Sequence, residues 1–401
     1  ILYATPVAIT FSFSVGKSLI VSATGIPAYV TGPFLDGNPS LATAQNSIFK
    51  VPLNPTENTG TPTATTAGNI GVFINGTALF DYRDGVAWDD AGGSLCGGPG
   101  NSPCPGGPGA TMDWNRDAIP AEMDGFDCSK GHPAMGNYHH HQNPSAFKLD
   151  LNVVSTICNT YDADGLYAMD STVHSPLLGF AYDGFPIYGA YAYADTNGTG
   201  AITRMKSGYE LSGASTRTDG PAVNATYFDG YFREDYTFVS HPGEKDYLDE
   251  HNGRFCVTPE YPDGIYCYFA TVDENWNSAY PYAVGPTFYG VTDVSTVTSI
   301  PGGATEYVST VGINDFELSN IEINVFPNPA NEFVVLQLNT LVKKDVTVEL
   351  YDITGKFISK TMVYQGTTIA HVDTRSLYSG QYIIKFTLNN EVVNRKLLIN
   401  K

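Results

Sequence analysis

Short runs of alternating apolar and polar positions recur along the chain. Residues 8–22 alternate apolar side chains with small or polar ones, as in Ala8-Ile-Thr-Phe-Ser-Phe-Ser-Val15, and predict two strands. No stretch between residues 1 and 300 keeps a helical apolar repeat over three turns. Because side chains alternate with period two along a strand, this pattern predicts an all-β protein.

Turn-forming residues divide the chain into segments. The 41 Gly and 25 Pro are spread along the sequence, which suits many short strands, and residues 90–110 are rich enough in both to predict a loop. Residues 301–320, which begin Pro-Gly-Gly-Ala-Thr, are the expected linker. We therefore expect a large β-rich domain over residues 1–300 and a smaller domain over residues 321–401.

The C-terminal segment has the pattern of a compact sandwich. Val346–Tyr351 and Gln381–Thr387 alternate in polarity and predict strands. Asp352-Ile-Thr-Gly355 follows the first of them and predicts a turn. Short strands joined by such turns indicate a small Ig-like β-sandwich.

The large domain contains an internal repeat. Gly71–Phe80 matches Gly179–Tyr188 without a gap, and each predicts a hairpin with a two-residue turn, at Asn75-Gly76 and at Asp183-Gly184. Further on, residues 127–132 parallel residues 249–254, and residues 136–141 parallel residues 264–269. The order is kept while the spacing differs, which predicts a duplicated β-unit with diverged loops. The alternative is coincidence among strands rich in Gly and Tyr.

Charge is distributed unevenly between the two domains. The chain has 21 Lys and Arg against 41 Asp and Glu, a formal net charge of −20. Residues 321–401 contain 9 basic and 7 acidic residues, so the first 320 contain 12 (21 minus 9) and 34 (41 minus 7). An acidic domain of this kind disfavours nucleic acid and anionic membranes as partners. Acidic loops could hold calcium, but the fragments at residues 162–165 and 195–200 lack the full twelve-residue spacing and predict turns.

Six cysteines, all in the acidic domain, suggest disulfides and an oxidising compartment. Cys96 and Cys104 flank a Gly- and Pro-rich loop, and Cys256 and Cys267 flank a second short loop. The remaining pair would be Cys128 and Cys158, although 15 pairings are open from sequence alone. The first residue is Ile1 rather than methionine, as expected after removal of an export signal.

Histidines cluster next to a predicted strand. Residues two apart on a strand project from the same face, so His139 and His141 would lie side by side, about 6–7 Å apart at Cα. Tyr138 and His140 would point to the opposite face. Two imidazoles at this spacing can bind one metal ion.

Two more histidines could complete a metal site. His132 lies seven residues before His139, across Pro133 and Gly136, and His174 precedes the second hairpin. Three neutral imidazoles suit copper or zinc, with copper favoured. The alternative is that these histidines pack against tyrosines and form structural hydrogen bonds. In the second repeat Cys267 and Phe269 replace the first pair, so we expect the site in one half.

Several separated blocks resemble the YHYH domain family. They are residues 131–132, 138–141, 174–189 and 248–254, within a likeness that covers residues 8–300. The family motif is Tyr-His-Tyr-His, so His140 departs from it at the third position, on the face assigned away from the metal. The resemblance implies secretion and a His-centred motif.

The tail resembles a type A sorting domain of the type IX secretion system. Val325–Ala330, Leu350–Lys356, Leu377–Tyr382 and Arg395–Lys401 carry the likeness. It implies export through the outer membrane of Bacteroidetes-type bacteria, recognition of residues 321–401 by the translocon, and cleavage afterwards. We therefore expect a secreted or cell-surface protein.

Three functions remain open from the sequence. The first is an exported copper- or zinc-binding or redox protein that uses His132, His139, His141 and His174. The second is a non-catalytic binding or adhesion module whose Tyr-rich faces contact polysaccharide or another surface ligand. The third is a hydrolase in which a His-bound metal activates water.

Overall fold

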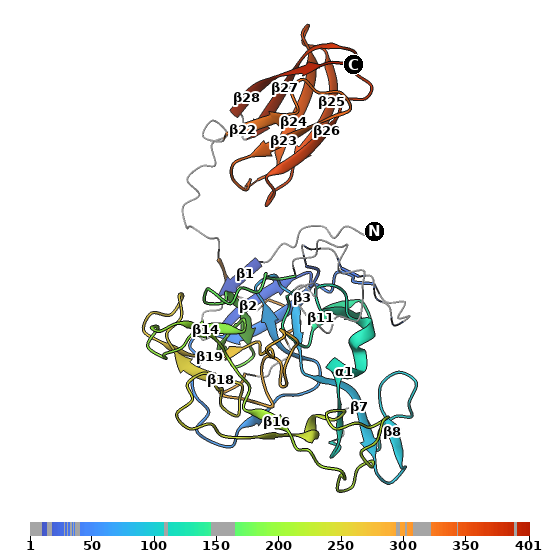
Figure 1. Cartoon of the computed structure of the whole chain (residues 1–401), viewed down its shortest axis with the longest axis vertical. Helices are drawn as coiled ribbons and strands as arrows, with labels where there is room; N and C mark the ends of the chain where they lie inside the picture. Colours follow the sequence, from blue (N-terminus) through green and yellow to red (C-terminus); the bar gives the residue numbers. More distant parts are fainter. Residues whose placement is uncertain are drawn as a thin grey trace. The chain divides into compact units, whose positions relative to one another are not determined.

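A computed structural model of the chain describes residues 10–13, 18–27, 29, 31–32, 34, 36, 41–107, 111–145, 165–293, 297–300, 303–307, 322–342, 344–388 and 391–401. The chain forms two compact units, Ile1–Tyr307 and Val308–Lys401. Both are built from β-sheets (Figure 1), which confirms the all-β prediction. The main α-helix of the described residues, α1, is a five-residue segment, Ala118–Glu122.

An eight-stranded mixed sheet is the centre of the first unit. Its order is β10-β11-β6-β5-β12-β13-β19-β18. The strands are β5 (Asn69–Phe73), β6 (Ala78–Phe80), β10 (His132–Ala134), β11 (Asn137–His140), β12 (Leu177–Ala181), β13 (Pro186–Tyr188), β18 (Gly253–Cys256) and β19 (Ile265–Phe269).

The two halves of this sheet have the same arrangement of strands. β5 and β12 pair antiparallel at its centre, and each is joined to its own hairpin partner, β6 or β13. β11 then adds parallel to β6, and β19 adds parallel to β13. The register agrees as well, since His140 lies opposite Leu79 and Tyr268 lies opposite Ile187. The two repeats of the sequence thus occupy matching places in one sheet.

Both expected hairpins are present, but their turns differ from the predicted two-residue type. Residues 74–77 connect β5 to β6, and the Phe73 N–H donates to the Thr77 carbonyl. Gly76 and Gly184 have positive φ, whereas their Asn and Asp neighbours do not. The Asn75 and Asp183 side chains instead accept the N–H two residues further on, which closes the turn without a left-handed residue there.

Smaller sheets surround the central one in the first unit. A four-stranded sheet has the order β21-β1-β2-β3, a three-stranded sheet has the order β8-β7-β9, and three further sheets are strand pairs, β14-β15, β16-β17 and β20-β4. Their bounds are β1 (Thr10–Phe13), β2 (Ser18–Ala23), β3 (Ser47–Pro52), β4 (Thr63–Ala64), β7 (Arg83–Asp89), β8 (Ser94–Cys96), β9 (Asn115–Asp117), β14 (Tyr191–Tyr193), β15 (Ile202–Arg204), β16 (Tyr209–Leu211), β17 (Tyr236–Phe238), β20 (Thr287–Phe288) and β21 (Thr305–Tyr307), with 3-10 turns η1 (Met123–Gly125) and η4 (Arg233–Asp235).

Part of the expected linker is a strand. Thr305–Tyr307 pairs with β1, because Thr and Tyr favour extended backbone and the edge of β1 is available for pairing. The two strands predicted over residues 8–22 are β1 and β2, which pair antiparallel. Residues 301–302 and 308–320 of the expected linker lie outside the described residues.

The cysteine pairs have different outcomes. Cys96 and Cys104 form the predicted disulfide. Cys256 and Cys267 are free thiols with their Sγ atoms 3.3 Å apart, so that predicted bond is absent. The reason lies in the register, which places Cys267 opposite Arg254 and leaves the two cysteines diagonal to each other. Cys128 is disulfide-bonded, while Cys158 lies outside the described residues.

The second unit is a two-layer sandwich. Its sheets have the orders β22-β23-β26 and β25-β24-β27-β28. The strands, coloured orange to red in Figure 1, are β22 (Ile323–Phe326), β23 (Phe333–Leu338), β24 (Val346–Asp352), β25 (Phe357–Val363), β26 (Ile369–Asp373), β27 (Gly380–Leu388) and β28 (Glu391–Ile399). Side chains from both sheets form one buried cluster that includes Leu336, Ile384 and Phe386. The strands and the turn predicted between residues 346 and 387 are therefore confirmed.

Candidate metal centre

One buried carboxylate holds the loop that leads into β10. Asp127 accepts the N–H groups of Ser129 and Gly131 at 2.9 and 3.2 Å, and the Tyr138 hydroxyl donates to the same carboxylate at 2.9–3.0 Å. A Cβ on Gly131 would lie 2.3 Å from the Tyr138 hydroxyl, so only glycine fits there. The loop is thereby closed against β11, and it sets the position of His132 at the start of β10.

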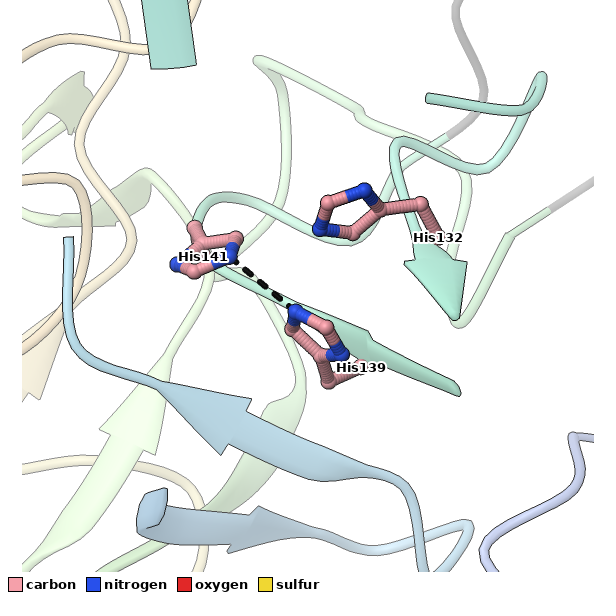
Figure 2. A group of neighbouring side chains, drawn as sticks. All are labelled: His132, His139 and His141. Atoms are coloured by element: carbon pink, nitrogen blue, oxygen red, sulfur yellow. Dashed lines mark hydrogen bonds between the residues drawn. The ribbon is translucent and has the colours of Figure 1, made fainter. Parts of the chain in front are cut away.

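Three histidines converge next to this loop (Figure 2). His132 lies opposite His139 in the β10–β11 pair, and His141 follows directly after β11. Their ring centroids are separated by 4.5–5.5 Å, and a ring nitrogen from each lies within 4.8 Å of the other two. All three are buried, with 6% or less of each residue exposed. The structure thus brings together His132, His139 and His141.

The hydrogen bonds of two of these rings fix where their protons lie. His139 Nδ1 donates to the carbonyl of Asn137 at 2.9 Å, and His141 Nδ1 donates to the carbonyl of Asp81 at 2.5 Å. A carbonyl oxygen accepts but cannot donate, so each neutral ring carries its hydrogen on Nδ1. Both Nε2 atoms then present lone pairs, and they face each other at 3.1 Å. Two such lone pairs repel unless a cation or a proton lies between them.

Glu122, at the end of α1, completes the cluster. Its Oε2 atom lies 3.3 Å from Nε2 of His132 and 3.3 Å from Nε2 of His141. Neither Glu122 Oε2 nor His132 Nε2 makes a hydrogen bond, although both are buried atoms. Asp117 starts the helix by accepting the Ile119 N–H, and this cap fixes the direction in which Glu122 points. Buried polar atoms that converge without partners are expected where an ion binds.

Burial and Glu122 act in opposite directions on the three rings. Burial lowers the pKa of His132 to about 4, and it lowers the pKa of His139 well below its usual range. Burial also lowers the pKa of His141, but the Glu122 carboxylate 3.3 Å away outweighs it and the net pKa is raised. Two of the rings are therefore neutral ligands at physiological pH, and protons compete with a metal most strongly at His141.

Three separations in the cluster fit a small coordination sphere. Donors about 2.0–2.1 Å from a tetrahedral metal lie about 3.3–3.4 Å from one another. The His139–His141 nitrogen pair is 3.1 Å apart, and Glu122 lies 3.3 Å from both His132 and His141. Phe80 stacks on His139 with centroids 3.8 Å apart, and Phe126 packs edge-on against His132. Aromatic walls of this kind limit the positions that the rings can take.

Comparison with known protein families matches two parts of the chain. Residues 48–281, more than half of the chain, match the family model described as YHYH protein. The chain belongs to the YHYH protein family. Residues 324–400 match the model described as secretion system C-terminal sorting domain, and they lie within the second unit.

The sorting domain decides where the YHYH protein is delivered. A type IX sorting domain indicates export to the cell surface or the extracellular space, and it implies handling by the type IX secretion system. Within the described residues, no helix has the length and apolar character needed to cross a membrane.

A curated relative is similar over a short stretch. It is the protein named endo-acting ulvan lyase, from Formosa agariphila, which is 30% identical over 93 residues. This stretch is 23% of the present chain and 17% of the relative's length. The chain therefore spans about a sixth of that protein.

The motif of the YHYH family begins on β11, ends one residue after it, and has two separate roles here. Tyr138 bonds Asp127, and His139 and His141 face the candidate metal position. His140 points away from it, since its Nδ1 donates to the Lys130 carbonyl and its Nε2 accepts from the Tyr29 hydroxyl at 2.8 Å. His140 is therefore a satisfied structural residue, and its departure from the family motif does not touch the cluster.

His174 and the acidic fragments lie elsewhere. His174 packs edge-on against Tyr188 and bonds the Ser175 carbonyl, and it is not part of the cluster. Asp195–Gly200 is a turn in which the Asp195 carboxylate bonds Lys245 at 2.6 Å. Residues 162–164 of the other fragment lie outside the described residues.

The second repeat has the same bond between a tyrosine and an aspartate that closes the loop, but it lacks the histidine cluster. Tyr266 donates to Asp249, which accepts the Gly253 N–H, as Tyr138 and Asp127 do in the first repeat. The positions that match His132, His139 and His141 are taken by Arg254, Cys267 and Phe269, as the pairing of β18 with β19 shows. The Arg254 guanidinium lies 5.8 Å from the centre of the Phe269 ring. This half carries no equivalent imidazole.

Glu122 is the residue that the sequence did not reveal. It is one of 34 acidic residues in the first 320, and it stands on a short helix ten residues before His132. Its signal is weak, an Asp N-cap followed by a five-residue helix, and nothing in the sequence relates that helix to β11.

Proposed function

We propose that this YHYH protein is an exported metal-binding protein that holds one copper or zinc ion between His132, His139 and His141, with Glu122 as a fourth donor. The observation that carries the proposal is the pair of Nε2 atoms of His139 and His141. Each ring uses Nδ1 for a backbone carbonyl, so the two Nε2 atoms that face each other at 3.1 Å are the ones that can bind an ion. Copper is favoured because nitrogen donors bind Cu²⁺ more tightly than Zn²⁺.

The donor set itself supports a metal over a purely structural role. A structural histidine cluster would pair its buried atoms, as His140 does with Tyr29 and Lys130. In the cluster, by contrast, His132 Nε2 and Glu122 Oε2 are buried without hydrogen bonds. A metal would satisfy both, and it would supply Lewis acidity or, as copper, one-electron chemistry.

A metal-dependent hydrolase is the second candidate. The side chain of Glu122 is 26% exposed, against 8% and 3% for His132 and His141, so Glu122 is the donor that solvent reaches most easily. If water replaced it, Glu122 could serve as the base beside that water. The adhesion module has less support, because large tyrosines such as Tyr82, Tyr138, Tyr188 and Tyr268 are buried rather than displayed on a face.

Elemental analysis of untagged protein tests the proposal. After loading with Cu²⁺ or Zn²⁺ and removal of excess ion, we expect about one metal per chain. His139→Ala and His141→Ala should lower the affinity about 100-fold or more, because a three-histidine site loses most of its strength with one ligand. His174→Ala is the matched control, since it removes a histidine outside the cluster, and it should keep full metal content.

Two outcomes would contradict the proposal. One is a chain that binds less than about 0.1 equivalent of either metal. The other is a His139→Ala variant that folds and binds as tightly as the parent. Glu122→Gln separates the two candidates, because a fourth ligand changes metal affinity about 10–100-fold, whereas a base leaves affinity nearly unchanged.

A further inference from the structure

A cavity of about 800 Å³ lies in the first unit and shares no residue with the histidine cluster. Its walls come from β7, from residues 64–67, and from the loop that the Cys96–Cys104 disulfide closes. The rest of the lining comes from Gly107, Thr111, Met112, Asn115 of β9 and Arg233 of η4. A volume of this size is typical of sites for small molecules.

The charges that line the cavity are all positive. Arg83 and Arg233 are its two charged lining residues, in a region of the sequence where 34 acidic residues outnumber 12 basic ones. Their carboxylate partners, Asp81 and Glu234, do not line the cavity. The cavity is therefore lined by guanidinium groups and not by the carboxylates that pair with them.

Each guanidinium keeps one nitrogen free. Arg83 uses Nε for Asp81 and Nη2 for the Thr65 carbonyl, which leaves Nη1 without a hydrogen bond to the described residues. Arg233 uses Nε for Glu234 at 2.5 Å and Nη1 for the Tyr82 hydroxyl at 2.7 Å, which leaves Nη2. Both guanidinium carbons lie within 6 Å of the centre of the Tyr82 ring, so the same side chain contacts both groups.

The walls are fixed before any ligand enters. The disulfide ties the Gly97–Cys104 wall to β8, and Asn115 holds Glu234 through its backbone N–H and its amide at 2.7 and 2.9 Å. Glu234 in turn holds Arg233. A preformed pair of donors loses little entropy when an anion binds.

We propose that this cavity binds a small organic carboxylate, of the size of one or two sugar rings. Two free guanidinium nitrogens suit the two oxygens of a carboxylate, which arginine recognises better than lysine does. Thr66 and Asn101 offer polar groups for hydroxyls, and Ala64, Ala67 and Ala87 offer apolar contact for a carbon skeleton. The site is separate from the proposed metal centre.

The inference is tested by measuring how D-glucuronate binds to the full chain at low salt. Calorimetry or ligand-observed NMR provides the measurement. We expect saturable binding at about the millimolar level and no comparable binding of D-glucose, which has the same ring without the carboxylate. Arg83→Gln and Arg233→Gln should each weaken binding about tenfold or more. The matched control is Arg204→Gln, since Arg204 also bonds a backbone carbonyl but lies outside the cavity.

Ala67→Phe keeps the test decisive if an arginine variant fails to fold. Ala67 lines the cavity and is exposed, so the larger ring should block the ligand without disturbing the core. His139→Ala should leave glucuronate binding unchanged. The assignment is overturned if glucose binds as well as glucuronate, if inorganic sulfate binds as tightly as the sugar acid, or if Ala67→Phe and the arginine variants leave the affinity within twofold.

Discussion

Removing the hydroxyl of Tyr138 tests how the loop before β10 is held. Tyr138 is fully buried, and its hydroxyl donates to the Asp127 carboxylate at 2.9–3.0 Å. Tyr138→Phe removes this donor without opening a cavity, because the ring remains. The carboxylate keeps three backbone donors, from Gly32, Ser129 and Gly131. Its hydrogen bonding is therefore reduced but not lost.

The expected cost is that of one hydrogen bond to a charged group, about 1.5–3 kcal/mol. For a domain of this size the melting temperature should fall by roughly 3–12 °C. Tyr266→Phe should have a similar effect, since Tyr266 donates to Asp249 at 2.9 Å in the second repeat. Tyr193→Phe is the control, because its hydroxyl makes no hydrogen bond among the described residues.

The cost of Tyr138→Phe should also depend on pH. Burial raises the pKa of Asp127 to about 6, above its ordinary value of 3.8, so its contribution to stability falls as pH rises from about 4 through about 6. Above that range the carboxylate is charged, and the hydrogen bonds that it accepts then contribute most to stability. The loss caused by Tyr138→Phe should therefore be larger at pH 8 than at pH 5.

Urea unfolding followed by tryptophan fluorescence measures these changes. All three tryptophans, at positions 88, 114 and 276, belong to the first unit, so the signal reports that unit alone. A change below about 0.5 kcal/mol in both phenylalanine variants, or a loss that is no larger at pH 8, would refute the reasoning.

Two further predictions concern the tail and a second buried carboxylate. Deletion of residues 321–401 should leave the first unit folded, with an unchanged unfolding midpoint, but should retain it inside the cell; efficient surface delivery of the truncated chain would contradict this. Burial raises the pKa of Asp117 to about 7, so stability should decline as pH rises from about 4 through about 7. Asp117→Asn cannot ionise and should flatten that decline, and an unchanged pH profile of the urea midpoint would show that Asp117 does not cause it.

Period-two patterns predict the structure best where a strand and its partner are close in the chain. The hairpins over residues 71–80 and 179–188 and the common face of His139 and His141 could be predicted because they depend on local geometry. The turn type could not, because the Asn75 and Asp183 side chains close the turns in place of a second left-handed residue.

Features assembled from distant segments were not predictable from spacing. His174 was a candidate through its closeness in sequence, yet it packs against Tyr188, whereas Glu122 from a separate helix joins the cluster. Arg83 and Arg233 are 150 residues apart in sequence, yet both contact the ring of Tyr82 and line one cavity. In each case the deciding contact depends on how the sheets pack, and the sequence pattern does not encode that.

The two halves of the central sheet provide an internal control on the histidine cluster. The bond between a buried tyrosine and an aspartate, together with the glycine that makes room for it, is present in both halves, so it belongs to the fold. The imidazoles are present in one half. In the other, Arg254 bonds the carbonyls of Tyr193 and Lys245, and Cys267 and Phe269 are fully buried around it. The same backbone is thus satisfied without histidines. The fold therefore does not itself require imidazoles at the positions of His132, His139 and His141, which is what the proposed metal site predicts.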